Sequence, residues 1–98
     1  MTRRQLQQKL EHAIRSEDPA AVGEAIKLGA KQNLLLPCGM LPMVLAVEMN
    51  STGMIANLRG YPIDESQWQA ASRAALGTEL ASMVAERHNP VPKPLGAT

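Results

Sequence analysis

Apolar residues recur along the start of the chain at the spacing of an amphipathic helix. One stripe contains Leu6, Leu10, Ala13 and Ile14, at intervals of four, three and one residues. This spacing places the four side chains on one helix face and leaves Gln, Lys, Glu and Arg on the other. Thr2 and Gln5 form a capping-box pattern, so the sequence predicts a helix over about residues 3–15.

A second helix is predicted directly afterwards, over about residues 19–28. Asp18 can cap the free N–H groups of its first turn, and Pro19 suits the first helical position because proline lacks an N–H. Gly29 stands where a helix commonly ends in a left-handed residue. Because only a few residues separate the two helices, they are expected to form an antiparallel hairpin.

Residues 30–39 interrupt the helical pattern. They contain three consecutive leucines, Leu34, Leu35 and Leu36, followed by Pro37 and Gly39. Proline and glycine at these positions are typical of a loop. The leucines either pack beneath the hairpins or present an apolar surface, and the sequence leaves both alternatives open.

The two-helix pattern then returns twice. Apolar stripes and capping residues predict four further helices, over about residues 42–49, 52–59, 64–75 and 80–88. The third of these begins at Asp64 with Gln67 three residues later. Three prolines at alternate positions in residues 89–98 favour an extended, flexible tail. We therefore expect an all-α domain over residues 1–88, built of three stacked antiparallel helical hairpins with six short helices.

An internal repeat supports this arrangement. An offset of 33 residues superposes Leu10 on Met43 and Ala13 on Ala46, and an offset of 25 then carries Ala46 to Ala71. A single hairpin cannot bury its apolar stripe alone, whereas stacked hairpins bury a continuous core between them. Alanine at the equivalent positions would allow neighbouring helices to approach closely.

The period and one motif resemble the ankyrin repeat. Residues 39–47, Gly-Met-Leu-Pro-Met-Val-Leu-Ala-Val, are similar to the family's G-x-T-P-L-H-x-A-A, and residues 28–30 match its L-G-A. Two positions depart from the pattern, because Leu41 replaces the capping Thr and Val44 replaces the His. The resemblance covers roughly residues 6–87 and implies an ankyrin-like stack of the kind found in small bacterial and phage proteins.

This resemblance also implies a binding surface. The loop before Pro42 would project toward a ligand, and the first helices of the hairpins would line the concave side. The partner-binding candidates are Gln7, Leu34, Leu35, Leu36, Met40, Glu48, Asn50, Glu65 and Arg73. Met is a flexible, polarisable side chain that suits either a core or an adaptable interface, so Met40 and Met49 are candidates for both.

Composition limits the chemistry that this chain can perform. Its 98 residues fit one domain, and ten Lys and Arg balance nine Asp and Glu. The sequence has no Phe, so the core is expected to be aliphatic. His12 and His88 suit surface or helix-end positions, and Cys38 has neither a histidine nor a basic residue beside it in the sequence. We predict no catalytic, cofactor-binding or metal-binding residues.

The same residues indicate which class of partner and which compartment to expect. The basic residues of the first helix are interleaved with acidic ones, and aromatic residues for stacking are almost absent, so nucleic acid is not expected. No secretory signal or membrane span is recognised, and a single cysteine fits a reducing compartment, so we expect a cytoplasmic protein.

The predicted function is non-enzymatic protein binding by a small regulator, inhibitor or adaptor. One alternative is an obligate structural subunit or secretion-type chaperone covered by another chain. A homodimer is a further candidate for the partner. A second alternative is a small nucleic-acid-binding regulator.

Overall fold

The computed structural model describes residues 2–85, which form six α-helices and no strand. The all-α prediction is therefore confirmed. The helices are α1 (Arg3–Arg15), α2 (Pro19–Leu28), α3 (Pro42–Glu48), α4 (Thr52–Leu58), α5 (Glu65–Ala75) and α6 (Ala81–Ala85). The predicted flexible tail, residues 89–98, and the predicted helix end near His88 lie outside the described residues.

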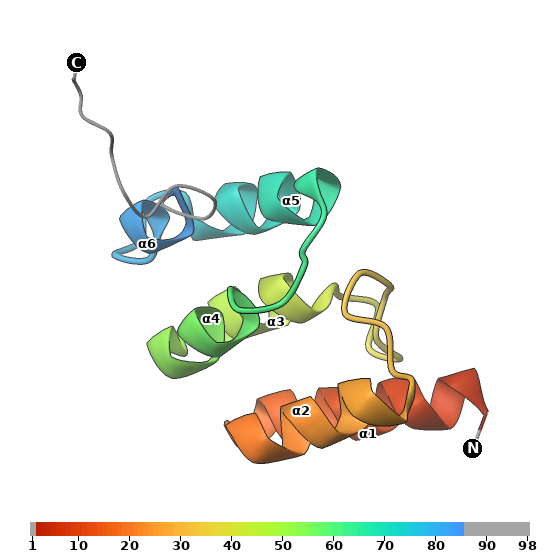
Figure 1. The fold of residues 1–98 in the computed structure, drawn as a ribbon. Helices are drawn as coiled ribbons and strands as arrows, with labels where there is room; N and C mark the ends of the chain where they lie inside the picture. The colour runs from red at the N-terminus through yellow and green to blue at the C-terminus, as the bar shows by residue number, and fades with distance from the viewer. Residues whose placement is uncertain (1, 86–98) are drawn as a thin grey trace.

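The helices are arranged as three pairs in successive layers (Figure 1). Within the layers α1 packs on α2, α3 on α4 and α5 on α6, while α3 also contacts α1 on one side and α5 on the other. The loop of residues 30–41, the link of residues 59–64 and the start of α1 lie at one end of the layers. The tight turns within the pairs lie at the opposite end.

Local sequence explains where the first helices begin. The Thr2 hydroxyl accepts a hydrogen bond from the Gln5 N–H at 3.1 Å, and the Gln5 side chain accepts one from the Thr2 N–H at 2.8 Å. This reciprocal pair is the predicted capping box. Asp18 caps α2 through the N–H groups of Ala20 and Ala21, with Pro19 at the first helical position. Leu41, which precedes α3, makes no side-chain cap.

The turns inside the first two pairs repeat at the 33-residue offset. The Asp18 N–H donates to the carbonyl oxygen of Ala13 at 3.1 Å, and the Ser51 N–H donates to that of Ala46 at 3.0 Å. The residue before each cap is left-handed, Glu17 with φ of 53° and Asn50 with φ of 57°. The two turns therefore share a backbone conformation and not only a pattern of apolar residues.

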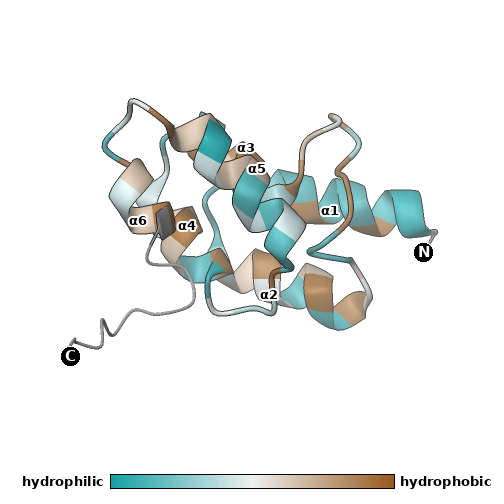
Figure 2. Ribbon diagram, turned by 90° about the horizontal axis from the view of Figure 1, so that it is seen from above, coloured by the Kyte–Doolittle hydropathy of each residue, from teal (hydrophilic) through white to brown (hydrophobic). Residues whose placement is uncertain are grey.

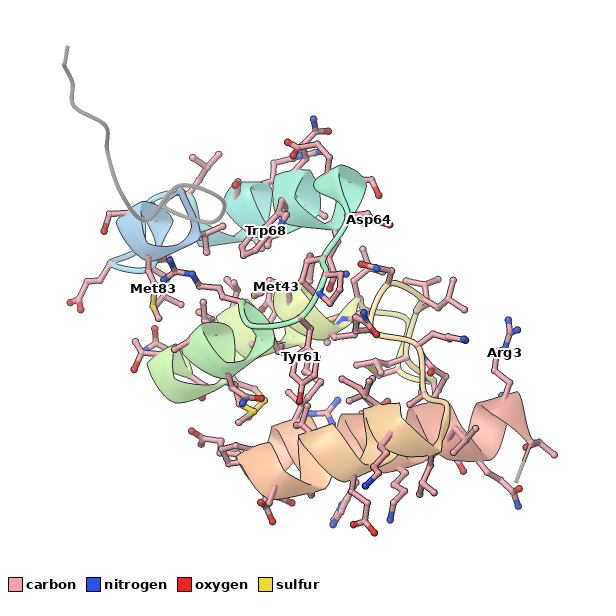
Figure 3. The ribbon with its side chains drawn as sticks, in the orientation of Figure 1. Arg3, Met43, Tyr61, Asp64, Trp68 and Met83 are labelled. Carbon is pink, nitrogen blue, oxygen red and sulfur yellow. The ribbon has the colours of Figure 1, made fainter. Side chains whose placement is uncertain are left out.

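The core between the layers is aliphatic, as the composition predicts. Its largest fully buried apolar side chains include Leu10, Ile14, Met43, Leu45, Met54, Ile55 and Leu58. Burying each such side chain contributes about 1.5–3 kcal/mol, so these contacts are the main source of stability. Trp68 is also buried, on the side of α5 that faces α3 and Met43 (Figure 3). Met40 and Met49 are partly buried against the same core.

Candidate interaction surface

The loop of residues 30–41 joins α2 to α3 and has no helix or strand of its own. Its tip is a tight turn, because the Gly39 N–H donates to the Leu36 carbonyl at 2.8 Å and the Leu36 N–H donates to the Met40 carbonyl at 2.8 Å. Gly39 has φ of 92°, a left-handed conformation that favours glycine. Leu36 is buried and anchors the tip to the core.

Gln7 of α1 holds the first half of the loop. This side chain is only 4% exposed. Its amide oxygen accepts the Lys31 N–H at 2.6 Å, and its amide nitrogen donates to the carbonyls of Lys31, Leu34 and Leu35 at 3.1–3.4 Å. One buried amide thus pairs with four backbone groups of the loop.

Gln67 of α5 holds the loop from the other side. The sequence places it in a capping-box pattern with Asp64, and its N–H does donate to the Asp64 carboxylate at 3.0 Å. Its fully buried side chain instead reaches the loop and α3. The amide oxygen accepts the Met43 N–H at 2.8 Å, and the amide nitrogen donates to the Gln32 carbonyl at 2.8 Å. Gln67 therefore satisfies a first-turn N–H of α3, the helix whose N-cap Leu41 has no hydroxyl.

Asn33 connects the loop to the link before α5. Its amide oxygen accepts the Asp64 N–H at 2.9 Å and the Gln67 side chain at 2.9 Å, and its amide nitrogen donates to the Pro62 carbonyl at 3.0 Å. Gln32 also donates to the Pro62 carbonyl, at 3.1 Å. These bonds fix an irregular loop without any strand pairing.

A further contact joins the loop tip to α1. The Cys38 N–H donates to the Glu11 carboxylate at 3.0 Å, and Arg15 forms an ion pair with the same carboxylate at 3.0 Å. Burial alone would raise the pKa of Glu11, but the hydrogen bonds from Arg15 and Cys38 outweigh it and hold this pKa below its ordinary value. Glu11 is therefore an ionised anchor for the tip, and Cys38 is exposed.

The structure separates the three consecutive leucines. Leu36 is buried, whereas Leu34 is 40% exposed and Leu35 is 60% exposed. Both alternatives that the sequence left open therefore occur within three residues. Since the loop backbone is held on two sides, Leu34 and Leu35 are displayed at a fixed position. Met40 is partly buried against the core.

A groove lies beside these leucines, between the loop and the start of α1. Its volume is about 350 Å³, and six residues line it: Arg3, Arg4 and Gln7 from α1, and Leu35, Leu36 and Pro37 from the loop. We call it the α1–loop groove. The hydrophilic first turns of α1 extend beyond the other helices at this end (Figure 2). Arg3 projects from α1 on the side where the loop lies (Figure 3).

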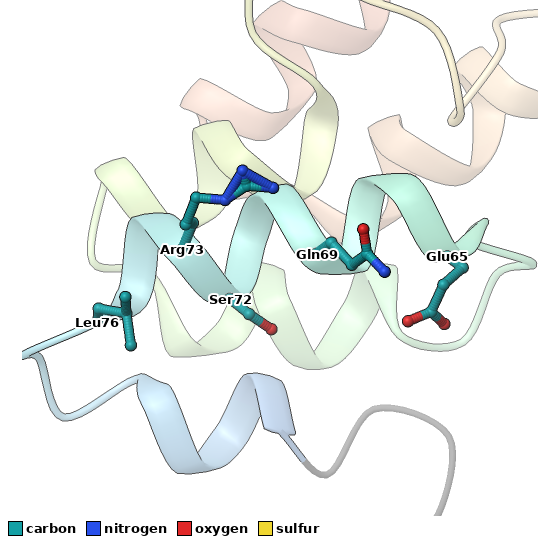
Figure 4. Close-up of a pocket in the computed structure, with 5 residues that line it drawn as sticks. All are labelled: Glu65, Gln69, Ser72, Arg73 and Leu76. Atoms are coloured by element: carbon teal, nitrogen blue, oxygen red, sulfur yellow. The ribbon is translucent and has the colours of Figure 1, made fainter.

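The other predicted residues lie elsewhere. Glu48 and Asn50 are exposed at the end of α3 and in the following turn, at the opposite end of the layers. Glu65 and Arg73 lie on α5, where they line a shallow hollow of about 430 Å³ with Gln69, Ser72 and Leu76 (Figure 4). The nine candidates therefore do not form one continuous surface. Gln7 and Leu36 contribute by holding the loop, because both are buried.

Within residues 2–85 no three His, Cys, Asp or Glu side chains gather closely enough to hold a metal ion. His12 is exposed on α1, and His88 lies outside the described residues. The same part of the chain contains no helix with the length and apolar character needed to cross a membrane.

Comparison of the chain with protein-family models, curated proteins and solved structures gave no match.

Sequence reasoning missed several residues of this surface. Arg3 and Arg4 stood out only as part of a basic helix, and Asn33 gave no signal. Gln67 has a local pattern that predicts a reciprocal cap with Asp64, yet its side chain bonds residues more than twenty positions away. Local periodicity carries no information about such a contact.

Proposed function

We propose that this protein is a non-enzymatic protein-binding module, a small regulator, inhibitor or adaptor that docks a partner on Leu34, Leu35 and the α1–loop groove. The observation that carries the proposal is the pair of exposed leucines on a loop held by buried amides. Exposed leucines add little to folding stability, while a fixed apolar projection loses little conformational entropy when a partner binds. Binding residues are commonly found on loops held by a rigid scaffold.

An ankyrin-like stack is part of the same proposal. It is supported by the two turns with matching hydrogen bonds 33 residues apart and by the succession of contacts from α1 to α3 to α5. In such a stack the loop of residues 30–41 occupies the place of a projecting finger. The pair of Leu34 and Leu35 then corresponds to a ligand-facing part of the molecule.

Site-specific photo-crosslinking tests this function. A photoreactive amino acid would replace Leu35 in one variant and Ala56, an exposed residue of α4, in a matched control. We expect one discrete cross-linked protein from position 35 in cells, its loss when Leu34→Ser is added, and no such product from position 56. Equal products from both positions would contradict the proposal.

Light scattering of the purified chain over a concentration series distinguishes reversible binding from an obligate assembly. We expect a monomer whose mass is unchanged by Leu34→Ser/Leu35→Ser. A dimer that this double change dissociates would instead assign the leucines to self-association. Loss of solubility in the wild type, cured by the same change, would favour an obligate subunit that requires another chain.

A further inference from the structure

The α1–loop groove combines an apolar side and a cationic side. Leu35 and Pro37 form the loop wall, and Arg3 and Arg4 stand on the first turn of α1 opposite them. Both arginines are exposed. In the part of the chain that the structure describes, neither arginine has an acidic partner. The groove therefore presents two guanidinium groups beside an exposed leucine.

Nearby acidic groups do not cancel this charge. The acidic residue that follows in the sequence, Glu11, is already bonded to Arg15 and to the Cys38 N–H. Glu17 and Asp18 lie in the turn at the other end of α1. Lys31 is exposed where the loop leaves α2, so it adds to the positive charge at this end. The net charge of the whole chain, +1, conceals this asymmetry.

We propose that the α1–loop groove binds a segment of a partner protein that carries Asp or Glu next to an aliphatic side chain. The inference rests on the proposed function and adds the chemical class of the partner. The carboxylate pairs with Arg3 and Arg4, since guanidinium groups bind carboxylates through paired hydrogen bonds. The aliphatic side chain packs against Leu35 and Pro37. A volume of about 350 Å³ accommodates a short segment rather than a folded surface.

The geometry of this groove depends on a part of α1 that has no counterpart in α3. The helix α1 contains 13 residues and α3 contains seven, although the two helices end at equivalent positions before their turns. The additional residues at the start of α1 supply Arg3, Arg4 and Gln7. The first turns of α1 therefore both hold the loop and supply the charge beside it.

Selection from a random peptide library tests the inference. The full chain would be immobilised, and binders would be removed first on the Leu34→Ser/Leu35→Ser variant, so that only peptides dependent on the leucines remain. We expect enrichment of Asp or Glu adjacent to Leu, Ile, Val or Met. Affinities of selected peptides would then be measured by fluorescence anisotropy.

The arginine variants supply the decisive comparison. We expect Arg3→Gln/Arg4→Gln to lower the affinity for an acidic peptide by about fivefold or more, because the change removes two exposed ion pairs that each contribute modestly. Lys27→Gln, an exposed change on α2, should leave the affinity within about twofold. The same peptide with Asn and Gln in place of Asp and Glu should no longer distinguish wild type from the arginine variant. Circular dichroism would verify that each variant folds.

The outcomes separate the two proposals. Peptides that depend on the leucines but show no acidic enrichment would overturn this inference and leave the proposed function standing. Failure to recover any leucine-dependent peptide would overturn both. Displacement of the acidic peptide by a short DNA duplex, steeply dependent on salt, would overturn the inference in favour of a nucleic-acid partner.

Discussion

The loop between α2 and α3 and the link between α4 and α5 make the same kind of connection, from one helix pair to the next. The loop covers residues 30–41 and displays Leu34 and Leu35, whereas the link covers residues 59–64 and displays no comparable pair. The carbonyl of Pro62 in the link accepts hydrogen bonds from the loop, and the Asp64 N–H donates to Asn33. One connection thus supports the other.

The difference shows how an irregular loop acquires a fixed shape. Neither connection contains a strand within residues 2–85, so no backbone ladder holds them. Buried amide side chains from α1 and α5 perform that task, because an amide can donate to one backbone group and accept from another. The loop should therefore depend on Gln7 and Gln67 more than on its own residues.

The largest effect is expected from Gln67→Met. Methionine has a similar size but leaves the Met43 N–H and the Gln32 carbonyl without their present partners, so the free energy of unfolding should fall by about 2–4 kcal/mol. Denaturation by urea measures it. Gln69→Met, on the exposed side of the same helix, is the matched control and should change stability by less than about 0.5 kcal/mol. Similar losses in both variants would refute a special role for Gln67.

A smaller loss is expected from Gln7→Met, which releases the first half of the loop while α3 keeps its bond from Gln67. We predict a decrease of about 1–3 kcal/mol in unfolding free energy, together with faster amide hydrogen exchange at Lys31. Gln8→Met, exposed on the same helix, is the control. Protection at Lys31 that survives the change would show that Gln7 does not hold the loop.

Glu11→Gln should cause a modest, pH-dependent change in the stability of the folded protein. The pKa of Glu11 is lowered in the folded protein, so its contribution to stability is present above the ordinary value of 4.5 and is lost as pH falls through the lower folded value. The wild type should therefore lose stability over this acidic range more steeply than the variant. Thermal unfolding measured from neutral to acidic pH would show it. Parallel curves would mean that the contact at Cys38 does not depend on charge.

The smallest effect on folding is expected from Leu34→Ser/Leu35→Ser. Because both side chains are exposed, the free energy of unfolding should change by less than about 1 kcal/mol. Leu36→Ser is the contrasting variant, since it places a hydroxyl in the core and should destabilise the protein by at least about 2 kcal/mol. A large loss from the double change would assign the exposed leucines to the fold rather than to a partner.

Most of the helices follow from local sequence, and the loop does not. Stripes of apolar residues and caps such as Thr2 and Asp18 act over one or two helical turns. The start of α1 and the start of α2 can therefore be predicted from the sequence. The bonds of Gln7 and Gln67 to the loop join residues more than twenty positions apart. No periodic pattern encodes these contacts.

The candidate surface was predictable only in part for the same reason. Leu34 and Leu35 were identified because three consecutive leucines in a loop either pack beneath the hairpins or present an apolar surface. Glu48 and Asn50 were grouped with them by the family resemblance, and they lie at the other end of the layers. The role of Arg3 and Arg4 becomes visible only when the start of α1 is placed beside the loop.

The matched turns at Glu17 and Asn50 bear on how such a chain can change length. A segment that runs from one left-handed residue to the next begins and ends in the same backbone conformation, and both turns are closed by the same pair of hydrogen bonds. Duplicating or deleting that segment would leave the junction unchanged. Recombination at these turns would therefore add or remove a whole helix pair and leave the start of α1 unchanged.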